Sequence, residues 1–563
     1  MQPTAPSRLR LLALPVVALV AALPFVAGPA GATLAATPAP PAPNVAVQVL
    51  ALNDFHGNLL PASGSGGRIG TTPAGGAEFL ATHVERLEAT NPHSVVVSAG
   101  DLIGASPLLS ALFHDEPTIE AMELIGLDIN AVGNHEFDEG ADELLRMQGG
   151  GCHPSDGCAF EGEQFDGADF QFLAANVVRS ASGETLLPPY TVKEFDGTKV
   201  AFVGMTLEGT PQIVTPSGVR GLEFRDEADT VNAIVPELRR QGVRSIVVLV
   251  HEGGVQTAGG GINDCAGISG PIVDIVQRLD DEVDAVITGH THQAYSCVLD
   301  GKPVTSASSF GRLVTDIDLV VNRRSGNVVP DKTRVNNRIV SQDVARNQDV
   351  SDLIARYREV AAPLENRVIG SVSGDITRTP NSAGESALGD VIADAQLAAT
   401  APDSLGGARI AFMNPGGIRA DLVASQISGG EQPDEVTYGE AFTVQPFGNN
   451  LVTLTLTGAQ IDTLLEQQFQ ATQNRILQVS EGFGYTWDAS KPRGERVDPS
   501  TITLDGVTVD PARDYRITVN SFLADGGDGF AVLPQGRDQL GGVVDLDALE
   551  AYFKASSPVA PGP

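Results

Sequence analysis

Aspartate, histidine and asparagine side chains recur where short apolar runs of the sequence end. Asp54 and His56 follow one run at positions i and i+2, and His290 and His292 repeat this spacing after another. In extended backbone, side chains two residues apart leave the same face. Counting the strand-end positions gives two carboxylates, four imidazoles and one amide oxygen, from Asp54, His56, Asp101, Asn134, His251, His290 and His292.

This set of side chains suits two divalent ions of the Zn or Mn type, because imidazole and carboxylate are their ordinary ligands. An aspartate between the two ligand sets could bridge both ions. The bridging water would then be a hydroxide near neutral pH, able to attack a phosphoryl group in line. The prediction from spacing alone is a two-metal phosphoesterase.

The number of coincidences supports the metal site more than any single residue does. A lone Asp after a strand is usually a helix cap, and a lone His is usually a hydrogen-bonded polar residue. Five of the nine histidines, however, lie in these loops: His56, His135, His251, His290 and His292. We expect ordinary structural roles for the other four, His83, His93, His114 and His153.

The elements that would hold these residues have an α/β pattern. β-Branched apolar runs end in the polar loops, and helix-like segments lie between them. Buried parallel strands have this composition, and ligands collect outside their carboxyl ends. The predicted strands are 45–52, 94–99, 129–132, 245–250 and 285–288, and the helices are 77–88, 119–125, 228–240 and 271–279.

A second domain is predicted after a linker. Residues 342–366 have apolar positions at helical spacing, namely Val350, Ile354, Tyr357 and Ala361. We therefore divide the chain into a first domain (44–340), a linker helix (341–366) and a second domain (367–555). The second domain has predicted strands at 409–413, 450–457 and 515–519, and predicted helices at 386–399 and 458–468.

The motifs NDFHGN, GD, GNHEFD, a strand-ending His and GHTH, in this order, resemble the calcineurin-like metallophosphatase domain of the 5'-nucleotidase family. The resemblance covers about residues 45–549. It implies a four-layer α/β/β/α sandwich followed by an α+β nucleotide-binding domain. It also implies one ion held by Asp54, His56, Asp101 and His292, and another held by Asp101, Asn134, His251 and His290, with Asp101 as the bridge. Some family members have Gln at the position of His292, which bears on the preferred metal.

The resemblance also makes His135 and Asp138 a catalytic dyad. An imidazolium would stabilise charge on the phosphoryl group or the leaving oxygen, and the carboxylate would orient the ring. The alternative is that His135 is a further metal ligand.

Three segments of the second domain, NPGGIR (414–419), PFGN (446–449) and NSFLADGGDGF (520–530), match the nucleoside-binding segments of the same family. Two aromatic rings could sandwich a base, an aspartate could accept hydrogen bonds from ribose, and an arginine could contact the phosphate or ribose. The alternative is that both rings belong to the core. The implied residues are Phe447 and Phe522 for the base, Asp528 for ribose, Arg419 for phosphate or ribose, Asn414 or Asn449 for the base edge, and Arg378 as an upstream arginine.

The first residues are typical of an export signal. Arg8 and Arg10 precede an apolar, proline-broken stretch and then small residues, which predicts a signal peptide and leader over 1–38 with cleavage at about 30–38. A membrane anchor is the alternative. Four cysteines then favour two disulfides, and of three pairings we prefer the local one, Cys152 with Cys158 and Cys265 with Cys297.

The formal net charge of −34 disfavours binding of nucleic acid polymers or anionic membranes. The expected function is a secreted phosphohydrolase of nucleoside 5'-monophosphates, with di- and triphosphates and UDP-sugars as further candidate substrates. One alternative is a 2',3'-cyclic-nucleotide 2'-phosphodiesterase/3'-nucleotidase. Another is a non-catalytic secreted nucleotide-binding protein. The sequence makes no prediction of oligomeric state.

Overall fold

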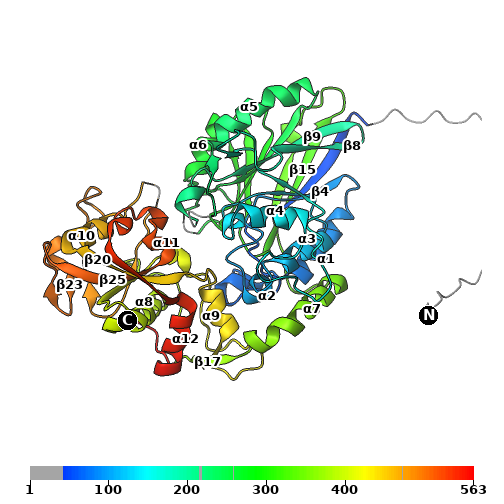
Figure 1. Cartoon of the computed structure of the whole chain (residues 1–563). Helices are drawn as coiled ribbons and strands as arrows, with labels where there is room; N and C mark the ends of the chain where they lie inside the picture. Colours follow the sequence, from blue (N-terminus) through cyan, green and yellow to red (C-terminus); the bar gives the residue numbers. More distant parts are fainter. Residues whose placement is uncertain (1–41, 215–217, 258, 472, 563) are drawn as a thin grey trace, which may run out of the picture. The chain divides into compact units, whose positions relative to one another are not determined.

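Two six-stranded sheets form the first half of the chain (Figure 1). The computed structural model describes residues 42–214, 218–257, 259–471 and 473–562, so the predicted signal peptide lies outside the described residues. The first sheet has the order β16 (Arg334–Ile339), β15 (Leu313–Asn322), β1 (Asn44–Leu52), β4 (Ser94–Ser98), β5 (Ile129–Ala131) and β6 (Gln171–Leu173). The second has the order β13 (Ala294–Leu299), β14 (Lys302–Ala307), β12 (Ala285–Thr288), β11 (Ser245–His251), β9 (Thr198–Thr206) and β8 (Tyr190–Phe195).

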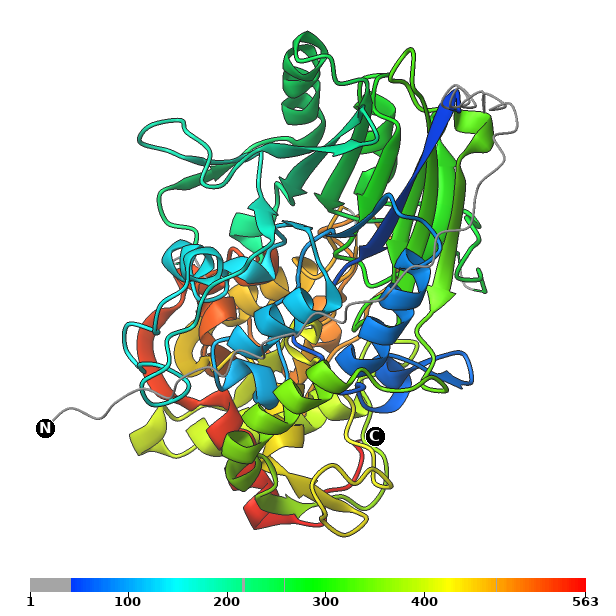
Figure 2. The ribbon, with the colours of Figure 1, turned by 90° about the vertical axis from the view of Figure 1, so that its right-hand side faces the viewer.

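Strand alternation places the two sheets face to face between helical layers. In β1, Val47 and Val49 pack in the core between the sheets, whereas Leu50 and Leu52 point to the helices on the outer face. That face packs against α1 (Ala77–Glu88) and α3 (Glu116–Ile125), and the outer face of the second sheet packs against α5 (Glu227–Arg240) and α6 (Pro271–Arg278). Figure 2 shows β1, in dark blue, running beside the green strands of its sheet. The predicted α/β/β/α sandwich is confirmed.

The helix that follows the sandwich is shorter than predicted. Helix α7 runs from Gln348 to Glu365, because the side chain of Asn347 accepts a hydrogen bond from the Val350 backbone N–H and caps the helix there. Residues 342–347 therefore lie outside the helix, contrary to the prediction. Its four predicted apolar positions are the buried ones.

The rest of the chain is an α+β arrangement around a five-stranded sheet. The order is β21 (Gln478–Val479), β18 (Ile410–Met413), β25 (Asp514–Asn520), β20 (Asn450–Thr457) and β26 (Arg537–Val544). Helices α8 (Ala387–Thr400), α10 (Gly458–Glu466) and α12 (Asp545–Ser556) accompany it. The prediction missed β26, whose sequence RDQLGGVV is exposed along nearly its whole length and has no buried alternation.

The remaining elements are short. The helices are α2 (Leu108–Ala111), α4 (Ala141–Gly149), α9 (Tyr438–Val444) and α11 (Ser521–Ala524). The strands are β2 (Arg68–Ile69), β3 (Thr72–Pro73), β7 (Val177–Arg179), β10 (Leu222–Phe224), β17 (Val368–Ser371), β19 (Glu435–Thr437), β22 (Phe483–Gly484), β23 (Thr503–Leu504) and β24 (Val507–Thr508).

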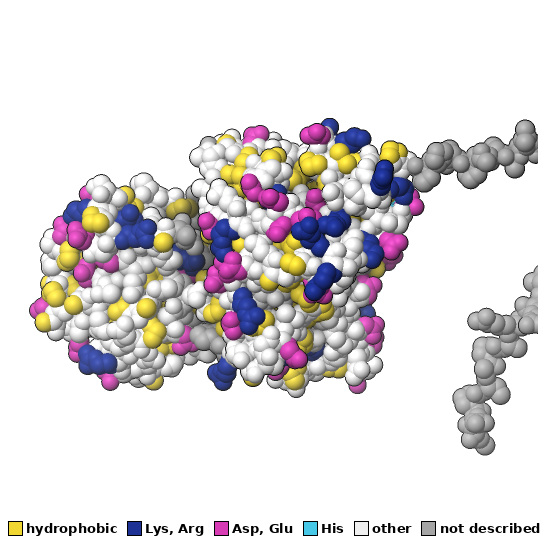
Figure 3. Space-filling model, turned by 90° about the horizontal axis from the view of Figure 1, so that it is seen from above, with side chains coloured by type: hydrophobic (Ala, Val, Ile, Leu, Met, Phe, Trp, Pro, Cys, Tyr) yellow, Lys and Arg dark blue, Asp and Glu magenta, His cyan; other side chains and the backbone are white. Residues whose placement is uncertain are grey.

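Both favoured disulfides are present, Cys152–Cys158 and Cys265–Cys297. Among the described residues, every helix is too short or too polar to cross a lipid bilayer. Acidic and basic side chains are intermixed on the face seen from above, without a continuous basic strip (Figure 3).

Candidate active site

The seven predicted metal ligands meet at the carboxyl ends of the parallel strands. Asp54 and His56 follow β1, Asp101 follows β4, and Asn134 follows β5, while the second sheet contributes His251 at the end of β11 and the two histidines after β12. Five of the seven adopt left-handed backbone conformations that non-glycine residues seldom use. Such strain persists where the surrounding structure imposes it, commonly at functional sites. These five are Asp54 (φ 50°), His56 (φ 48°), Asp101 (φ 52°), His290 (φ 67°) and His292 (φ 55°).

One group of ligand atoms forms around Asp54. The Nε2 atoms of His56 and His292 lie 3.1 Å apart, and His292 Nε2 lies 3.3 Å from Asp54 Oδ1. Ligand atoms of one metal ion, each about 2.1 Å from it, are separated by similar distances. Asp54 and His56 are almost completely buried, so these polar atoms are shielded from bulk solvent.

A second group forms around His251. Its Nε2 lies 2.9 Å from Asp101 Oδ2, yet the two are not aligned as a hydrogen bond, which leaves this buried nitrogen without a hydrogen-bond partner. Alongside, His290 Nδ1 lies 3.1 Å from Asn134 Oδ1. Asp101 Oδ2 is also 3.7 Å from His56 Nε2, so this carboxylate faces both groups. That is the position a bridging ligand requires.

The outward nitrogens of two rings are fixed by backbone carbonyls. His56 Nδ1 donates to Gly104 O at 2.8 Å, and His251 Nδ1 donates to Ala99 O at 2.7 Å. This leaves Nε2 of each ring for a metal ion, the arrangement that orients ligand imidazoles in metalloproteins. Burial also lowers the pKa of His56 well below its usual range and that of His290 to about 3, which favours the neutral, metal-binding imidazole. The donor set therefore fits divalent ions.

Two residues that the sequence analysis did not select position the ligands. The buried carboxylate of Glu136 accepts hydrogen bonds from the backbone N–H groups of Asp101 (3.0 Å), Leu102 (2.9 Å) and Gly133 (2.7 Å). Asn53 donates to Asp54 Oδ2 at 2.6 Å. Glu136 lies in the motif GNHEFD, and Asn53 lies in the motif NDFHGN. Their position next to predicted ligands was the sequence signal that could have identified them.

His135 and Asp138 form a close pair beside the metal ligands. His135 Nδ1 lies 2.7 Å from Asp138 Oδ2. Burial lowers the pKa of His135, but the carboxylates of Asp138 and Asp101 outweigh it and raise this pKa above its ordinary value. His56, Asp101 and His135 also come within range of a single ion. The contact at Nδ1 favours the dyad over the ligand interpretation.

A cavity of about 190 Å³ joins this pair to residues of the second half of the chain. Its wall contains Asn134, His135, Asp138 and His290 together with Asn414, Arg419, Phe447, Asn449, Phe522 and Asp528. A larger cavity of about 690 Å³, beside Leu60, Arg358 and Ile427, contains none of the predicted site residues. The structure thus brings all the predicted substrate residues except Arg378 to one pocket. Arg378 lies in a small neighbouring cavity that it shares with Arg419.

The two predicted base-binding rings line this pocket and are only partly buried. Phe447 stacks on His135, with ring centroids 5.7 Å apart and an interplanar angle of 22°. Phe522 packs at the edge of the apolar core of the second half. Their placement favours a ligand-facing role over a wholly structural one.

Asp528 is held by a network that includes a residue the sequence analysis missed. Asn414 Nδ2 donates to Asp528 Oδ2 at 2.9 Å, and Asn520 Nδ2 donates to Asn414 Oδ1 at 3.0 Å. Arg475 forms an ion pair with Asp528 and lines the same pocket. Nothing in the local sequence around Arg475 marks it. Arg419 Nη2 lies 3.5 Å from His56 Nε2, which places a guanidinium between the metal ligands and the pocket.

Two protein families match this chain. Residues 47–294 match the family described as calcineurin-like phosphoesterase, and residues 368–535 match the 5'-nucleotidase, C-terminal domain. The matches fall on the sandwich and on the later α+β half. The exact domain boundaries stay a prediction.

Two relatives and one solved structure extend this likeness. Endonuclease YhcR of Bacillus subtilis is 32% identical over 532 residues, which are 92% of this chain and 40% of that protein. Cell wall protein Lmo0130 of Listeria monocytogenes is 33% identical over 518 residues, 87% of this chain and 64% of that protein. This chain therefore spans less than two thirds of either relative. The crystal structure of the 5'-nucleotidase precursor from Thermus thermophilus superimposes with a TM-score of 0.73 at 25% identity, covering 92% of this chain and 99% of that one.

Proposed function

Because the chain belongs to the 5'-nucleotidase family, with a calcineurin-like phosphoesterase domain and a 5'-nucleotidase C-terminal domain, it is a metal-dependent phosphoesterase, and we propose that its substrates are nucleoside 5'-monophosphates. The observation that carries the proposal is the shared pocket. Its wall combines the His135–Asp138 pair and two metal ligands with the aromatic rings and the carboxylate of Asp528. Such a wall suits a ligand with a phosphate at one end and a base at the other.

Two divalent ions, one in each ligand group with Asp101 between them, would neutralise phosphoryl charge and activate a water for in-line attack. The side chains of the chain do the rest. His135, protonated and held at Nδ1 by Asp138, presents Nε2 to the phosphoryl or leaving oxygen. Arg419 contacts the phosphate or ribose and lies beside the metal ligand His56.

The other pocket residues would bind the nucleoside. Phe447 and Phe522 offer aromatic faces to the base, and Asp528 accepts hydrogen bonds from ribose hydroxyls. Asn414 already donates to Asp528, so it holds that carboxylate in place. Of Asn414 and Asn449, we therefore assign Asn449 to the edge of the base. We assign Arg378 to the phosphate end of the substrate, because it lines the same small cavity as Arg419.

The name of the Bacillus relative raises a second candidate, cleavage of nucleic acid. This chain matches only 40% of that protein, and its own net charge of −34 opposes association with a polyanion. A non-catalytic binding role is disfavoured because all seven predicted ligands, Asn134 included, and the dyad are present and brought together. We favour the mononucleotide substrate.

An extracellular location is part of the proposal. It is supported by the predicted signal peptide, by two disulfides, which persist in oxidising compartments, and by the likeness to a cell wall protein.

A substrate panel tests the proposal. Purified protein with Mn²⁺ or Zn²⁺ is offered AMP, 3'-AMP, 2',3'-cyclic AMP, UDP-glucose and single-stranded DNA, and phosphate release and DNA length are followed. Preferential release from AMP supports it. Preferential turnover of 2',3'-cyclic AMP and 3'-AMP would support the cyclic phosphodiesterase alternative, and DNA shortening would support the nuclease.

A further inference from the structure

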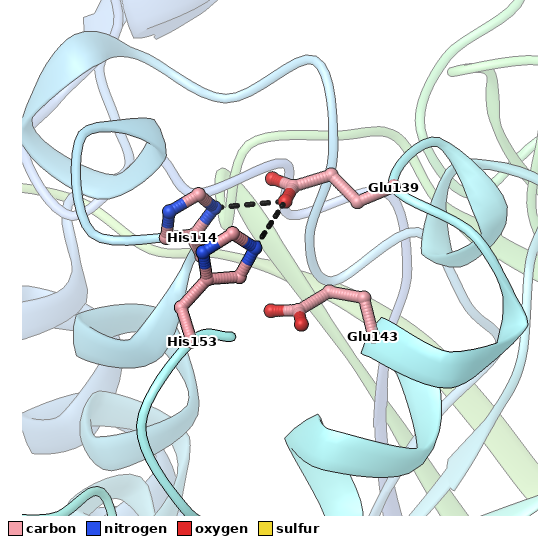
Figure 4. Close-up of side chains that lie close together, drawn as sticks. All are labelled: His114, Glu139, Glu143 and His153. Atoms are coloured by element: carbon pink, nitrogen blue, oxygen red, sulfur yellow. Dashed lines mark hydrogen bonds and ion pairs between the residues drawn. The ribbon is translucent and has the colours of Figure 1, made fainter. Parts of the chain in front are cut away.

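Outside the active site, two histidines and two glutamates converge from different segments (Figure 4). His114 lies between α2 and α3, and His153 lies inside the loop closed by Cys152–Cys158. Glu139 follows Asp138 of the dyad, and Glu143 is in the first turn of α4. Each offers one ligand atom, and the four atoms all lie within 4.8 Å of one another. We call these four residues the His114 cluster.

The imidazoles of the cluster share one carboxylate. Their rings are nearly parallel, with centroids 3.6 Å apart and an interplanar angle of 13°. Glu139 Oε2 lies 2.8 Å from His114 Nδ1 and 4.0 Å from His153 Nε2, contacts that appear as dashed lines in Figure 4. One nitrogen of each ring therefore faces the same carboxylate oxygen.

A third carboxylate occupies the opposite edge of both rings. Asp156 Oδ2 lies 2.9 Å from His114 Nε2 and 3.6 Å from His153 Nδ1. A carboxylate behind an imidazole, accepting its outer N–H, is what orients metal-ligating histidines. His153 and Asp156 both belong to the disulfide loop, which keeps them together.

The charge of the cluster favours a cation. Three carboxylates surround two stacked imidazoles, and two imidazolium ions at this separation would repel each other. Arg146 donates to Glu143 and neutralises part of that charge, which leaves Glu139 and Asp156 in excess.

We propose that His114, His153, Glu139 and Glu143 bind one divalent ion of the Zn²⁺ class, separate from the ions of the active site. Two imidazoles and two carboxylates are ordinary zinc donors. In tetrahedral zinc sites the ligand atoms lie about 3.4 Å from one another. The four atoms, which now lie within 4.8 Å of one another, would therefore move slightly closer together around an ion. Asp156 Oδ2 accepts the outer N–H of His114 at 2.9 Å, and the backbone N–H of Asp156 donates to His153 Nδ1 at 3.2 Å, so Asp156 fixes the outer edge of each ring.

The site would stabilise the turn that carries the dyad. Glu139 is the residue after Asp138, and a cavity of about 130 Å³ is lined by His114, Glu139 and Glu143 and also by His135 and Asp138. An ion held by Glu139 fixes the backbone on one side of Asp138. This consequence rests on the proposed function, whereas the metal site itself does not.

Zinc content of the full chain tests the site. Wild type, a His114→Gln/His153→Gln variant and a His83→Gln/His93→Gln control are chelated, reloaded with Zn²⁺, freed of excess metal and measured by mass spectrometry. We expect the cluster variant to bind one equivalent fewer than wild type and control. A Glu139→Gln variant, which keeps both rings, should bind its third equivalent at least tenfold more weakly, and circular dichroism confirms that each protein is folded.

An Asp54→Asn/Asp101→Asn variant tests whether the His114 cluster binds zinc when the active site does not. It should lose zinc from the active site and keep one equivalent at the cluster. Equal zinc content in folded wild type and the His114→Gln/His153→Gln variant, or no zinc in the Asp54→Asn/Asp101→Asn variant, would overturn the proposal. Failure to hydrolyse nucleotides leaves both zinc counts unaffected, so the two proposals fail separately.

Discussion

His135 Nδ1 lies 2.7 Å from Asp138 Oδ2, and this contact decides what the imidazole can do. A proton shared at Nδ1 leaves Nε2 as the nitrogen available to a substrate oxygen. The backbone N–H of His135 also donates to Asp101 Oδ1 at 2.9 Å. The proposed acid is therefore tied to the carboxylate that faces both groups of candidate ligand atoms.

Replacing Asp138 with Asn should lower kcat for AMP by roughly 10²- to 10⁴-fold, the usual contribution of general acid–base catalysis. The amide can still contact the ring but does not stabilise the imidazolium. Metal content should stay at the wild-type level, because Asp138 is not among the proposed ligands. A variant that retains wild-type kcat would contradict the dyad assignment.

Replacing Phe522 with Ala should weaken recognition of the base. Stacking of a base on an aromatic ring contributes about 1–3 kcal/mol, so kcat/KM for AMP should fall about 5- to 150-fold. Ribose 5-phosphate, which has no base, serves as the control substrate and should be hydrolysed as by wild type. Equal losses on both substrates would mean that Phe522 supports the fold rather than the base.

Replacing Arg475 with Gln should raise KM for AMP by roughly 10- to 150-fold, since it removes a charged hydrogen-bond partner worth roughly 1.5–3 kcal/mol. The ion pair with Asp528 is expected to hold that carboxylate toward the ribose. Arg475→Lys should restore part of the affinity, and kcat should change little in either variant. A fall in kcat at constant KM would place Arg475 in a different role.

Asp284 gives a prediction for stability far from the metal ligands. It accepts a hydrogen bond from the Ile246 N–H at 2.9 Å, and burial raises its pKa to about 7. In the unfolded chain this pKa is about 3.9, so the folded state binds the proton more tightly and loses stability as pH rises from about 4 to 7.

Asp284→Asn keeps a side-chain oxygen as acceptor but has no proton to lose. Its free energy of unfolding relative to wild type should therefore increase between about pH 5 and pH 8, by an amount on the order of 2–4 kcal/mol. Urea unfolding at the two pH values measures this. A constant difference between the proteins would show that Asp284 titrates as in the unfolded chain.

The sequence predicted the sandwich, and also that the seven candidate ligands would converge, because both depend on local patterns; their role as metal ligands stays a prediction. The alternation of side chains along β1 determines which of its valines lie between the two sheets. The residues that directly follow the strand then lie at the edge of the sheet where the parallel strands end. The start of α7 was set instead by a single side chain, Asn347, which the apolar periodicity does not report.

Contacts between distant segments were the part that the sequence did not reveal. Arg475 meets Asp528, and His114 stacks on His153, only because loops far apart in the chain fold against each other. His114 and His153 were expected to be ordinary polar residues, since neither stands at a strand end. Their neighbours in space, Glu139 and Asp156, supply the charges that make them a cluster.

Phosphate release from AMP by chelated and metal-reloaded protein tests the central claim most directly. Wild type should be inactive after chelation and should recover with Mn²⁺ or Zn²⁺, whereas Asp101→Asn, which removes the carboxylate facing both ligand groups, should not recover. Undiminished hydrolysis by the fully chelated protein, or full recovery of Asp101→Asn, would contradict a two-metal phosphohydrolase bridged at Asp101.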